Sequence, residues 1–478
     1  METEKIEVIS PDMFEFTQLD EKIFDTKFET KAVGYFGDAF RRFCKNKSSV
    51  VAFFILLLII LLAIFAPMVS KYDPTVLDTD GALLPSRIPG LEKLGIFDGC
   101  KKFEHVSLDY VKSITDPFLE TVPAEEYSKY KFVEYIVGVD SMEELEAQAY
   151  TEEIRGEMKK FVDFKYNLYK HYQAPKWVQG RTHAEYLAYK EQGAIVLDAE
   201  GKEMIVIDKS AAGILNQRPD LIPEGQTVED FYVYKIYIDP VVANGGKEVY
   251  HYFGTDHTGR DLWTRIWVGA RLSLLIGLFV AIVSISVGVV WGAISGYYGG
   301  AVDMVMERFV EVLTGIPWIV LMIIIKMLLR GKVHDTFIVA ISLVLTSWTG
   351  TAGMVRSQMY RYKNREYVLA SRTLGSNDFR LISKHILPNA LGTIVTGSVL
   401  VIPSAIFFES SVAYLGLGVN SSTISIGNLL NQGRDAGIVE NPYLTLWPAL
   451  VISLLMISFN MFGNGLRDAL NPSLRGAE

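Results

Sequence analysis

Long apolar runs alternate with short polar segments over most of this chain. The first run, residues 50–69, is apolar without interruption. About 20 apolar residues suffice to cross the hydrocarbon core of a bilayer, so this run predicts a membrane-spanning helix. Five further spans are expected, at approximately 270–296, 304–329, 336–359, 390–416 and 444–466. The pattern therefore predicts an all-α polytopic membrane protein with six transmembrane helices.

Residues 71–252 interrupt this pattern, because they are charged and rich in aromatic side chains and contain no run long enough to span. Most of 127–172 is expected to be helical. By contrast, 194–208 predicts a hairpin that turns near Glu200 and Gly201, and 231–238 predicts a further strand. An α+β domain is thus inserted after the first span, either as a docking surface for an extracellular partner or as a passive addition.

Charge is distributed unevenly along the chain. The formal net charge is −9, and residues 71–252 hold 21 Lys/Arg against 32 Asp/Glu, which leaves +2 for the remainder. Segment 356–384 carries seven Lys/Arg and two acids, which places it in the cytoplasm by the positive-inside rule. Alternation then puts both termini in the cytoplasm of a multi-pass cell-membrane protein and 71–252 outside. An acidic insert also argues against nucleic acid as a partner.

The N-terminal 1–48 is expected to be a cytoplasmic tail rather than a cleavable signal peptide. Aromatic residues recur at helical spacing over 32–47 and basic residues crowd its end, which predicts an interfacial helix or a plain basic patch. Residues 49–70 then form the first anchor. Cys44 and Cys100 flank this span, so they should lie on opposite sides of the membrane without a disulfide.

Segment 364–388 lies between the fourth and fifth spans and is polar and strongly basic. It predicts two short amphipathic helices joined at Gly375, a residue suited to a left-handed C-terminal cap. Asp378 is expected to cap the second helix. Pro388 suits the first turn of the following span, where its missing N–H costs nothing. Such an element is suited to docking into a protein cleft; the alternative is a basic loop that only fixes topology.

Each of these two short helices has an expected apolar or small face. These faces consist of Tyr367, Ala370, Ser371 and Leu374 in the first helix, and Phe379, Ile382 and Ile386 in the second.

A few ionisable residues fall in or beside the apolar runs. Glu409 follows Pro403 in the fifth span, and it either lines a translocation path or is a hydrogen-bonded carboxyl near the outer end of a kinked helix. Lys326 lies near the outer end of its span and is expected to snorkel. Small residues at 347–353 would let helices approach closely.

Residues 253–261 read Phe-Gly-Thr-Asp-His-Thr-Gly-Arg-Asp and predict a charge-paired turn that precedes an interfacial helix. A metal site formed by His251, Asp256, His257 and Asp261 has suitable ligand types. The spacing fits no standard site, so no metal is expected.

Five segments, in order, resemble the C-type permease subunit of peptide (oligopeptide, dipeptide or nickel) ABC importers. They are GTDHTGRDLWTRIWVGARLSLLIGL, SGYYGGAVDMVMERFVEVLTGIP, EYVLASRTLGSNDFRLISKHILPNAL, ESSVAYLGLGV and GNGLRDALNP. The third resembles the Glu-Ala-Ala coupling signature of such permeases, although Leu369 replaces its Glu and Ser371 its second Ala. The resemblance covers 253–472 and 33–70 and leaves out the insert.

This resemblance implies a type I ABC-importer permease fold with a permease core over 253–472. It implies a heterodimer with a homologous permease, two cytoplasmic ATPases that bind ATP and Mg²⁺, and an extracellular peptide-binding lipoprotein. ATPase coupling would fall on Glu366, Ala370, Ser371, Gly375, Asp378 and Pro388. The translocation path would include Glu409 and Pro403.

No phosphate-binding GxxxxGK[ST] loop or catalytic motif is present, so neither a cofactor nor catalysis is expected in this chain. Two other functions remain open. A membrane-anchored extracellular receptor or interaction protein would need only one or two anchors. A secondary transporter would normally show an internal repeat, and none is clear.

Overall fold

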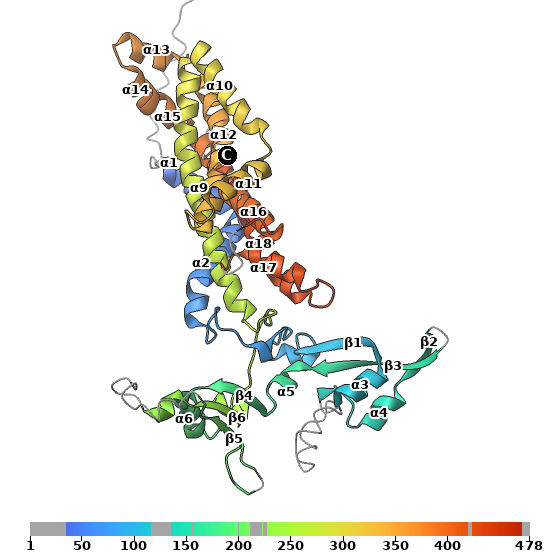
Figure 1. Cartoon of the computed structure of the whole chain (residues 1–478). Helices are drawn as coiled ribbons and strands as arrows, with labels where there is room; N and C mark the ends of the chain where they lie inside the picture. Colours follow the sequence, from blue (N-terminus) through green and yellow to red (C-terminus); the bar gives the residue numbers. More distant parts are fainter. Residues whose placement is uncertain are drawn as a thin grey trace, which may run out of the picture.

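The computed structural model describes residues 35–115, 135–154, 157–198, 200–210, 222, 227–418 and 423–470. A long helical bundle carries the insert at one end, whereas the short helices α13 and α14 lie at the opposite end (Figure 1). The bundle helices are α1 (Tyr35–Lys45), α2 (Lys47–Val69), α9 (Leu262–Tyr298), α10 (Gly300–Gly315), α11 (Trp318–Leu329), α12 (Asp335–Tyr362), α15 (Leu387–Val399), α16 (Val401–Tyr414), α17 (Ile426–Asp435) and α18 (Tyr443–Leu470).

Five helical stretches in the described part of the chain are long and apolar enough to cross a membrane, or six if a bent pair counts as one span. The bent pair is α10 and α11, which meet at 83°. Residues 304–329 were expected to be one span; they form two helices, which make one span only if the bent pair crosses the membrane together. Ile316 is extended (ψ 124°) because the ring of Pro317 disfavours a helical residue before it.

Helix α9 is longer than its apolar run. Asp261 caps it, with a side chain that accepts a hydrogen bond from the Thr264 N–H, and the helix continues unbroken for 37 residues. At 1.5 Å per residue this is about 55 Å. The separate interfacial helix expected after residue 261 is therefore the first part of α9. One rigid element runs the whole length of the bundle.

Glycines on α9 allow α12 to pack closely against it. A Cβ on Gly292 would lie 2.3 Å from the Ala352 carbonyl oxygen, and one on Gly296 would lie 2.6 Å from the Met359 Cβ. Close approach was expected from small residues of α12, and it is confirmed at Thr351, whose Cβ would lie 2.7 Å from a Cβ on Gly288. The Ser347 hydroxyl also shares a hydrogen bond with the Ser284 hydroxyl of α9. Gly350 and Gly353 have nothing within 4 Å of a Cβ position, so the close approach depends on the glycines of α9 and on these two hydroxyl residues of α12.

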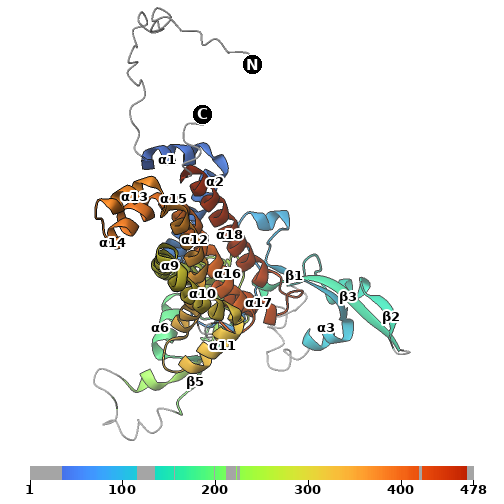
Figure 2. The ribbon, with the colours of Figure 1, turned by 90° about the horizontal axis from the view of Figure 1, so that it is seen from above.

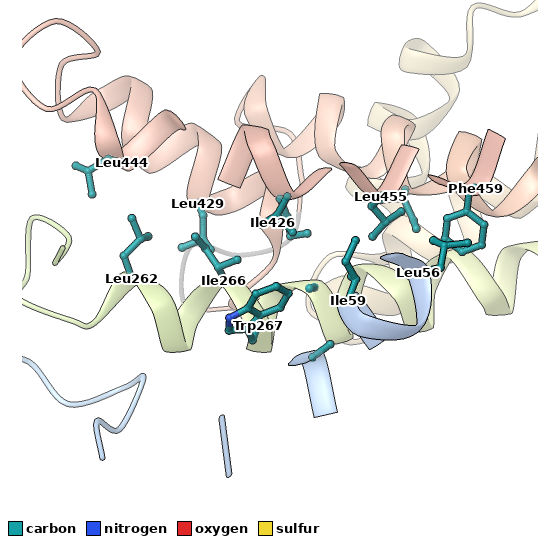
Figure 3. Packing of buried hydrophobic residues seen from close by; sticks show 14 of the residues in the cluster. Leu56, Ile59, Leu262, Ile266, Trp267, Ile426, Leu429, Leu444, Leu455 and Phe459 are labelled. Carbon is teal, nitrogen blue, oxygen red and sulfur yellow. The ribbon is translucent and has the colours of Figure 1, made fainter. Parts of the chain in front are cut away.

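A second layer packs α2, α17 and α18 around α9. Leu56, Ile266, Ile426 and Leu455 are buried together in this cluster (Figure 3). At the far end of α18, α1 lies across the bundle (Figure 2), and the rings of Phe43 and Phe462 meet edge to face at 5.5 Å.

The insert contains two three-stranded antiparallel sheets with strand orders β1-β3-β2 and β4-β6-β5. The strands are β1 (Cys100–Ser107), β2 (Tyr150–Ile154), β3 (Glu157–Asn167), β4 (Lys176–Arg181), β5 (Ile205–Asp208) and β6 (Val233–Ile238). Short helices accompany them: α3 (Leu108–Thr115), α4 (Met142–Ala147), α5 (Leu168–Tyr172), α6 (His183–Glu191) and α8 (Pro240–Ala243).

The helical prediction for 127–172 is wrong over β2 and β3, and residues 127–134 lie outside the described part. In β3, buried Val162, Phe164 and Tyr166 alternate with Asp163 and Lys165, a period of two that favours a strand. The hairpin prediction for 194–208 is confirmed, since the Asp198 N–H donates to the Lys202 carbonyl at 2.9 Å. The strand predicted over 231–238 is confirmed as β6.

Candidate coupling segment and cavity

The polar segment after α12 folds into three short pieces at the end of the bundle: α13 (Glu366–Thr373), α14 (Asp378–Arg380) and the π-helix η9 (Leu381–Ile386). We call residues 364–386 the coupling segment. Gly375 ends α13 with φ +84°, the left-handed conformation that its position predicted. Asp378 does not cap the second helix as expected, because Asn377 does so by accepting a hydrogen bond from the Arg380 N–H.

The coupling segment is held on the bundle by a small apolar core. Val368, Leu381 and Ile386 are fully buried against Met359 and Ala293, which belong to α12 and α9. Burial of a large aliphatic side chain contributes about 1.5–3 kcal/mol, so three such anchors fix the segment as a unit.

Polar contacts join the same segment to the end of α9. The Tyr297 hydroxyl donates to Asp378 Oδ1 at 2.5 Å and accepts from Arg372 Nη2 at 3.1 Å. Lys363 Nζ donates to the Gly296 carbonyl oxygen at 2.9 Å. Within the segment, the Ser371 hydroxyl lies 3.2 Å from His385 Nε2. Both halves of the segment are therefore tied to one tyrosine at the tip of α9.

The outer surface of the segment stays open. Leu374 is 88% exposed and Phe379 is 79% exposed, beside partly exposed Tyr367 and Leu369. Glu366, Ala370, Gly375, Asp378 and Pro388 are also exposed, and Ser371 is half-buried. The predicted face of the first helix is not the packed one, because Val368 is its buried residue. In the second, Ile386 is buried and Ile382 packs on the same core as predicted, whereas Phe379 is exposed. Apolar side chains on a polar, basic tip are a feature of protein interaction sites.

A partly buried ion pair joins α10 to α12 near this end. Arg356 donates Nε to Asp303 Oδ1 and Nη2 to Asp303 Oδ2, both at 2.6 Å, and the Tyr360 hydroxyl donates to the same carboxylate at 2.7 Å. The sequence prediction did not include Tyr297, Asp303 or Arg356. The Tyr-Tyr-Gly-Gly sequence at the end of α9 was the available signal for Tyr297.

A cavity of about 500 Å³ lies between α9, α11, α12, α15 and α16. Hydroxyl, aromatic and thioether side chains line it, and no ionisable side chain is among the described lining residues. The lining includes Trp318, Met322, Ser347, Thr351, Ser404 and Phe408. The rings of Trp318 and Phe408 meet edge to face at 5.1 Å and narrow one side.

Glu409 lies outside this cavity lining although its neighbour Phe408 belongs to it. Its carboxylate is 1% exposed and accepts hydrogen bonds from the hydroxyls of Ser273 at 3.0 Å and Ser410 at 3.3 Å. Pro403 is buried in α16, next to the cavity-lining Ser404. The Lys326 Nζ donates to the carbonyl oxygens of Leu417 at 2.8 Å and Gly418 at 2.6 Å, just after α16.

Three of the four residues considered for a metal site make other contacts. His251 Nδ1 lies 2.8 Å from Asp261 Oδ1, and Asp256 pairs with Arg260 and Arg265. Within the described residues, no group of three or more His, Cys, Asp or Glu side chains is placed to hold a metal ion.

The fold is that of a polytopic helical permease whose bundle ends in the short helices α13 and α14. Residues 288–476 match the family model of the binding-protein-dependent transport system inner membrane component. Residues 34–85 match the N-terminal transmembrane domain of oligopeptide transport permease C. Most of the insert lies between the two matched ranges.

Curated relatives agree with this class. The chain is 45% identical over 225 residues to the dipeptide transport system permease protein DppC of Bacillus subtilis (strain 168), covering 47% of this chain and 69% of that protein. It is 44% identical over 225 residues to the oligopeptide transport system permease protein OppC of the same organism, covering 47% and 72%. OppC of Haemophilus influenzae is 41% identical over 228 residues, with 48% and 72% covered. The chain belongs to the C-type permease family of oligopeptide and dipeptide ABC importers.

Proposed function

We propose that this chain forms half of the translocation pathway of an ATP-driven peptide importer, as a heterodimer with a homologous permease. Two cytoplasmic ATP-binding subunits would dock on the coupling segment and carry the nucleotide, Mg²⁺ and catalysis. An extracellular peptide-binding lipoprotein would deliver the peptide. The single observation that carries this proposal is the coupling segment itself, with a buried anchoring face, a contact to α9 and an exposed apolar tip.

The position of the insert supports the proposed orientation. The coupling segment and the insert lie at opposite ends of the bundle (Figure 1). If the coupling segment meets ATPases in the cytoplasm, then 71–252 is extracellular. Residues 1–48 would be cytoplasmic, since α1 precedes α2 at the end of that helix that faces away from the insert (Figure 1). The C-terminal end would be cytoplasmic too, because Phe462 near the end of α18 packs on Phe43 of α1.

Roles for the predicted residues follow from their positions. Exposed Glu366 and Ala370 would contact an ATPase, while Gly375 provides the turn. Ser371 and Asp378 would hold the segment together and to Tyr297. Pro388, in the first turn of α15, would pass displacement of the segment into the bundle. This displacement shifts the equilibrium between the outward-open and inward-open pore only if the closed ATPases bind the two conformations with different affinity.

The charge-free cavity would be this subunit's part of the path. Pro403 would set the course of α16 beside the cavity. Glu409 would hold α16 against α9 through its hydrogen bond from Ser273. Because a path without ionisable side chains has no charge preference, selection among peptides would fall to the binding protein.

Reconstitution tests this function. The chain, its partner permease, the two ATP-binding subunits and the binding protein are placed in proteoliposomes with radiolabelled tripeptide. We expect accumulation that requires ATP and all subunits. Uptake driven by an ion gradient without the ATPases would instead identify a secondary transporter, and binding without uptake would identify a receptor.

A further inference from the structure

The insert consists of a base and two lobes. Cys100 pairs with Asn167 in one antiparallel ladder, and Lys176 pairs with Ile238 in the other. We call residues 101–166 lobe 1 and residues 177–237 lobe 2. Each lobe begins and ends beside a pair of hydrogen-bonded residues, so its two ends lie next to each other. The remainder, 71–100, 167–176 and 238–252, is the base. The lobes extend away from the bundle axis in different directions (Figures 1 and 2).

Backbone hydrogen bonds join the base to residues 253–261, the segment that leads into α9. The Leu83 N–H donates to the Asp256 carbonyl at 2.9 Å, and the Thr255 N–H donates to the Leu84 carbonyl at 2.9 Å. Contact is so close that a Cβ on Gly259 would lie 1.6 Å from the Asp78 carbonyl oxygen. The base is thus continuous with the bundle rather than tethered to it.

Side-chain contacts also attach the base of the insert to α18. The Trp447 Nε1–H donates to the Ser86 hydroxyl at 2.9 Å, and the Trp447 ring stacks on Phe253 at 4.1 Å. The Tyr169 hydroxyl donates to the Pro85 carbonyl at 3.0 Å. Two bundle helices therefore fix the orientation of the base.

A buried charge pair secures the same junction. Asp256 accepts hydrogen bonds from Arg265 on α9 and from Arg260. Burial alone would raise the pKa of Asp256, but the charge of Arg265 and hydrogen bonds from Thr258 and Arg260 outweigh it and hold the pKa below its usual value. The carboxylate is therefore ionised at neutral pH, and the ion pair is intact.

Negative charge is concentrated on the lobes. Among described residues, lobe 1 has 6 Lys/Arg and 10 Asp/Glu, lobe 2 has 5 and 8, and the base has 6 and 7. The net charges are thus −4, −3 and −1. The lobes also expose apolar side chains, including Tyr110 (61%), Met158 (69%) and Val206 (55%). Acidic surfaces with exposed apolar groups are suited to a protein partner of opposite charge.

We propose that the two lobes form an acidic docking platform for a basic face of the importer's extracellular binding protein, held in fixed orientation on α9 and α18 by the base. This inference rests on the proposed function. The lobes project away from the bundle, whereas a partner permease would meet this chain along its membrane helices. Opposite charges across such a contact accelerate encounter and make affinity dependent on salt.

Excision of single lobes tests the platform, because each lobe begins and ends at paired residues. In one variant Cys100 is joined to Asn167 by an Asn-Gly turn; in the other Lys176 is joined to Ile238 in the same way. Binding of peptide-loaded binding protein to the complete importer in nanodiscs is measured at 50 mM and 500 mM salt. Each excision should weaken binding about tenfold at low salt and less at high salt, with basal ATPase activity unchanged.

Point substitutions on the lobes serve as a control, because the direction of the change in affinity for the binding protein is predicted for each. Glu153→Gln in lobe 1 and Glu191→Gln in lobe 2 remove exposed acids and should each weaken low-salt binding about twofold to threefold. Lys160→Gln removes an exposed basic side chain from lobe 1 and should strengthen low-salt binding. These surface changes leave both sheets intact.

Unchanged affinity after both excisions would overturn the proposal. So would loss of the partner permease from the excised complexes, because the lobes would then serve permease pairing. Equal weakening by Glu153→Gln and Lys160→Gln would also count against an acidic platform. Failure of the proposed function is distinguishable, since the wild-type importer itself would then show no ATP-dependent uptake.

Discussion

The hydroxyl of Tyr297 donates a hydrogen bond to the Asp378 carboxylate at 2.5 Å and thereby joins the tip of α9 to the coupling segment. Arg372 donates to the same hydroxyl from the other half of the segment. A single side chain thus connects both short helices to the one helix that runs the length of the bundle. Any displacement of the segment must either move α9 or break these bonds.

Tyr297→Phe removes both hydrogen bonds and keeps the ring. A hydrogen bond to a charged group contributes about 1.5–3 kcal/mol, so we expect the segment to slip relative to α9. Peptide uptake per ATP hydrolysed should fall severalfold while ATPase activity persists. Tyr298→Phe is the matched control, because the neighbouring Tyr298 is 55% exposed. Equal coupling ratios in the two variants would contradict the role of Tyr297.

Gly375→Val tests the turn between the two halves. No atom lies within 4 Å of a Cβ at this position, so the cost comes from the backbone at φ +84°. Left-handed conformations cost about 1–2 kcal/mol for most residues, but Asn adopts them more readily. We expect normal membrane insertion with uncoupled ATP hydrolysis for Gly375→Val, and near-normal uptake for Gly375→Asn. Normal uptake by the Val variant would exclude a rigid turn.

Gly292→Val tests the close packing of α9 on α12. The new side chain would meet the Ala352 carbonyl and the Val355 Cβ, at 2.3 and 2.9 Å from its own Cβ. Such overpacking costs about 1–3 kcal/mol, so the thermal midpoint of the detergent-solubilised chain should fall. Gly353→Ala, where nothing lies within 4 Å, should leave the midpoint unchanged or higher. Tolerance of Gly292→Val would mean that α9 and α12 are not closely packed.

The base of the insert should lose stability on acidification. Burial, together with the charge of Lys176, lowers the pKa of His171 below its usual value of 6.5, against an opposing effect of Asp80. The unfolded chain therefore takes up the proton first. Stability is complete above about pH 6.5 and falls as the pH decreases through the folded pKa.

Amide hydrogen exchange over residues 167–176 measures this effect at pH 7.5 and 5.5, after correction for the intrinsic pH dependence of exchange. We expect protection to decrease at pH 5.5 in the wild type and to change less in His171→Phe, which keeps the ring contacts with Tyr135 and Tyr166. An identical decrease in both proteins would assign the pH dependence to other groups.

The apolar pattern predicted the bundle well where one run corresponds to one straight helix, as in α2, α12 and α18. It failed at Pro317, because hydropathy averages over a bend that depends on a single backbone position. It also placed the start of α9 too late, since buried polar and charged residues such as Thr264 and Arg265 interrupt the apolar run while remaining helical.

In the coupling segment, features set by local sequence were predictable and contacts between distant residues were not. Gly375 was predictable because its role is local, a left-handed cap. The contact between Tyr297 and Asp378 joins residues 81 positions apart, and no local spacing reveals it. Assignment of the cap to Asp378 rather than Asn377 was an error of one residue between two side chains with similar capping preference. In the insert, β3 was taken for a helix because its charged residues favour helices while its period of two favours a strand.

The most direct test of the central claim is site-specific cross-linking in the assembled importer. Leu374→Cys and Phe379→Cys are introduced separately after Cys44 and Cys100 are replaced by Ser, and a short thiol cross-linker is added to inverted membrane vesicles. The account predicts links from both positions to an ATP-binding subunit. Labelling of these positions by a membrane-impermeant thiol reagent in intact cells, with no link to any ATP-binding subunit, would contradict it.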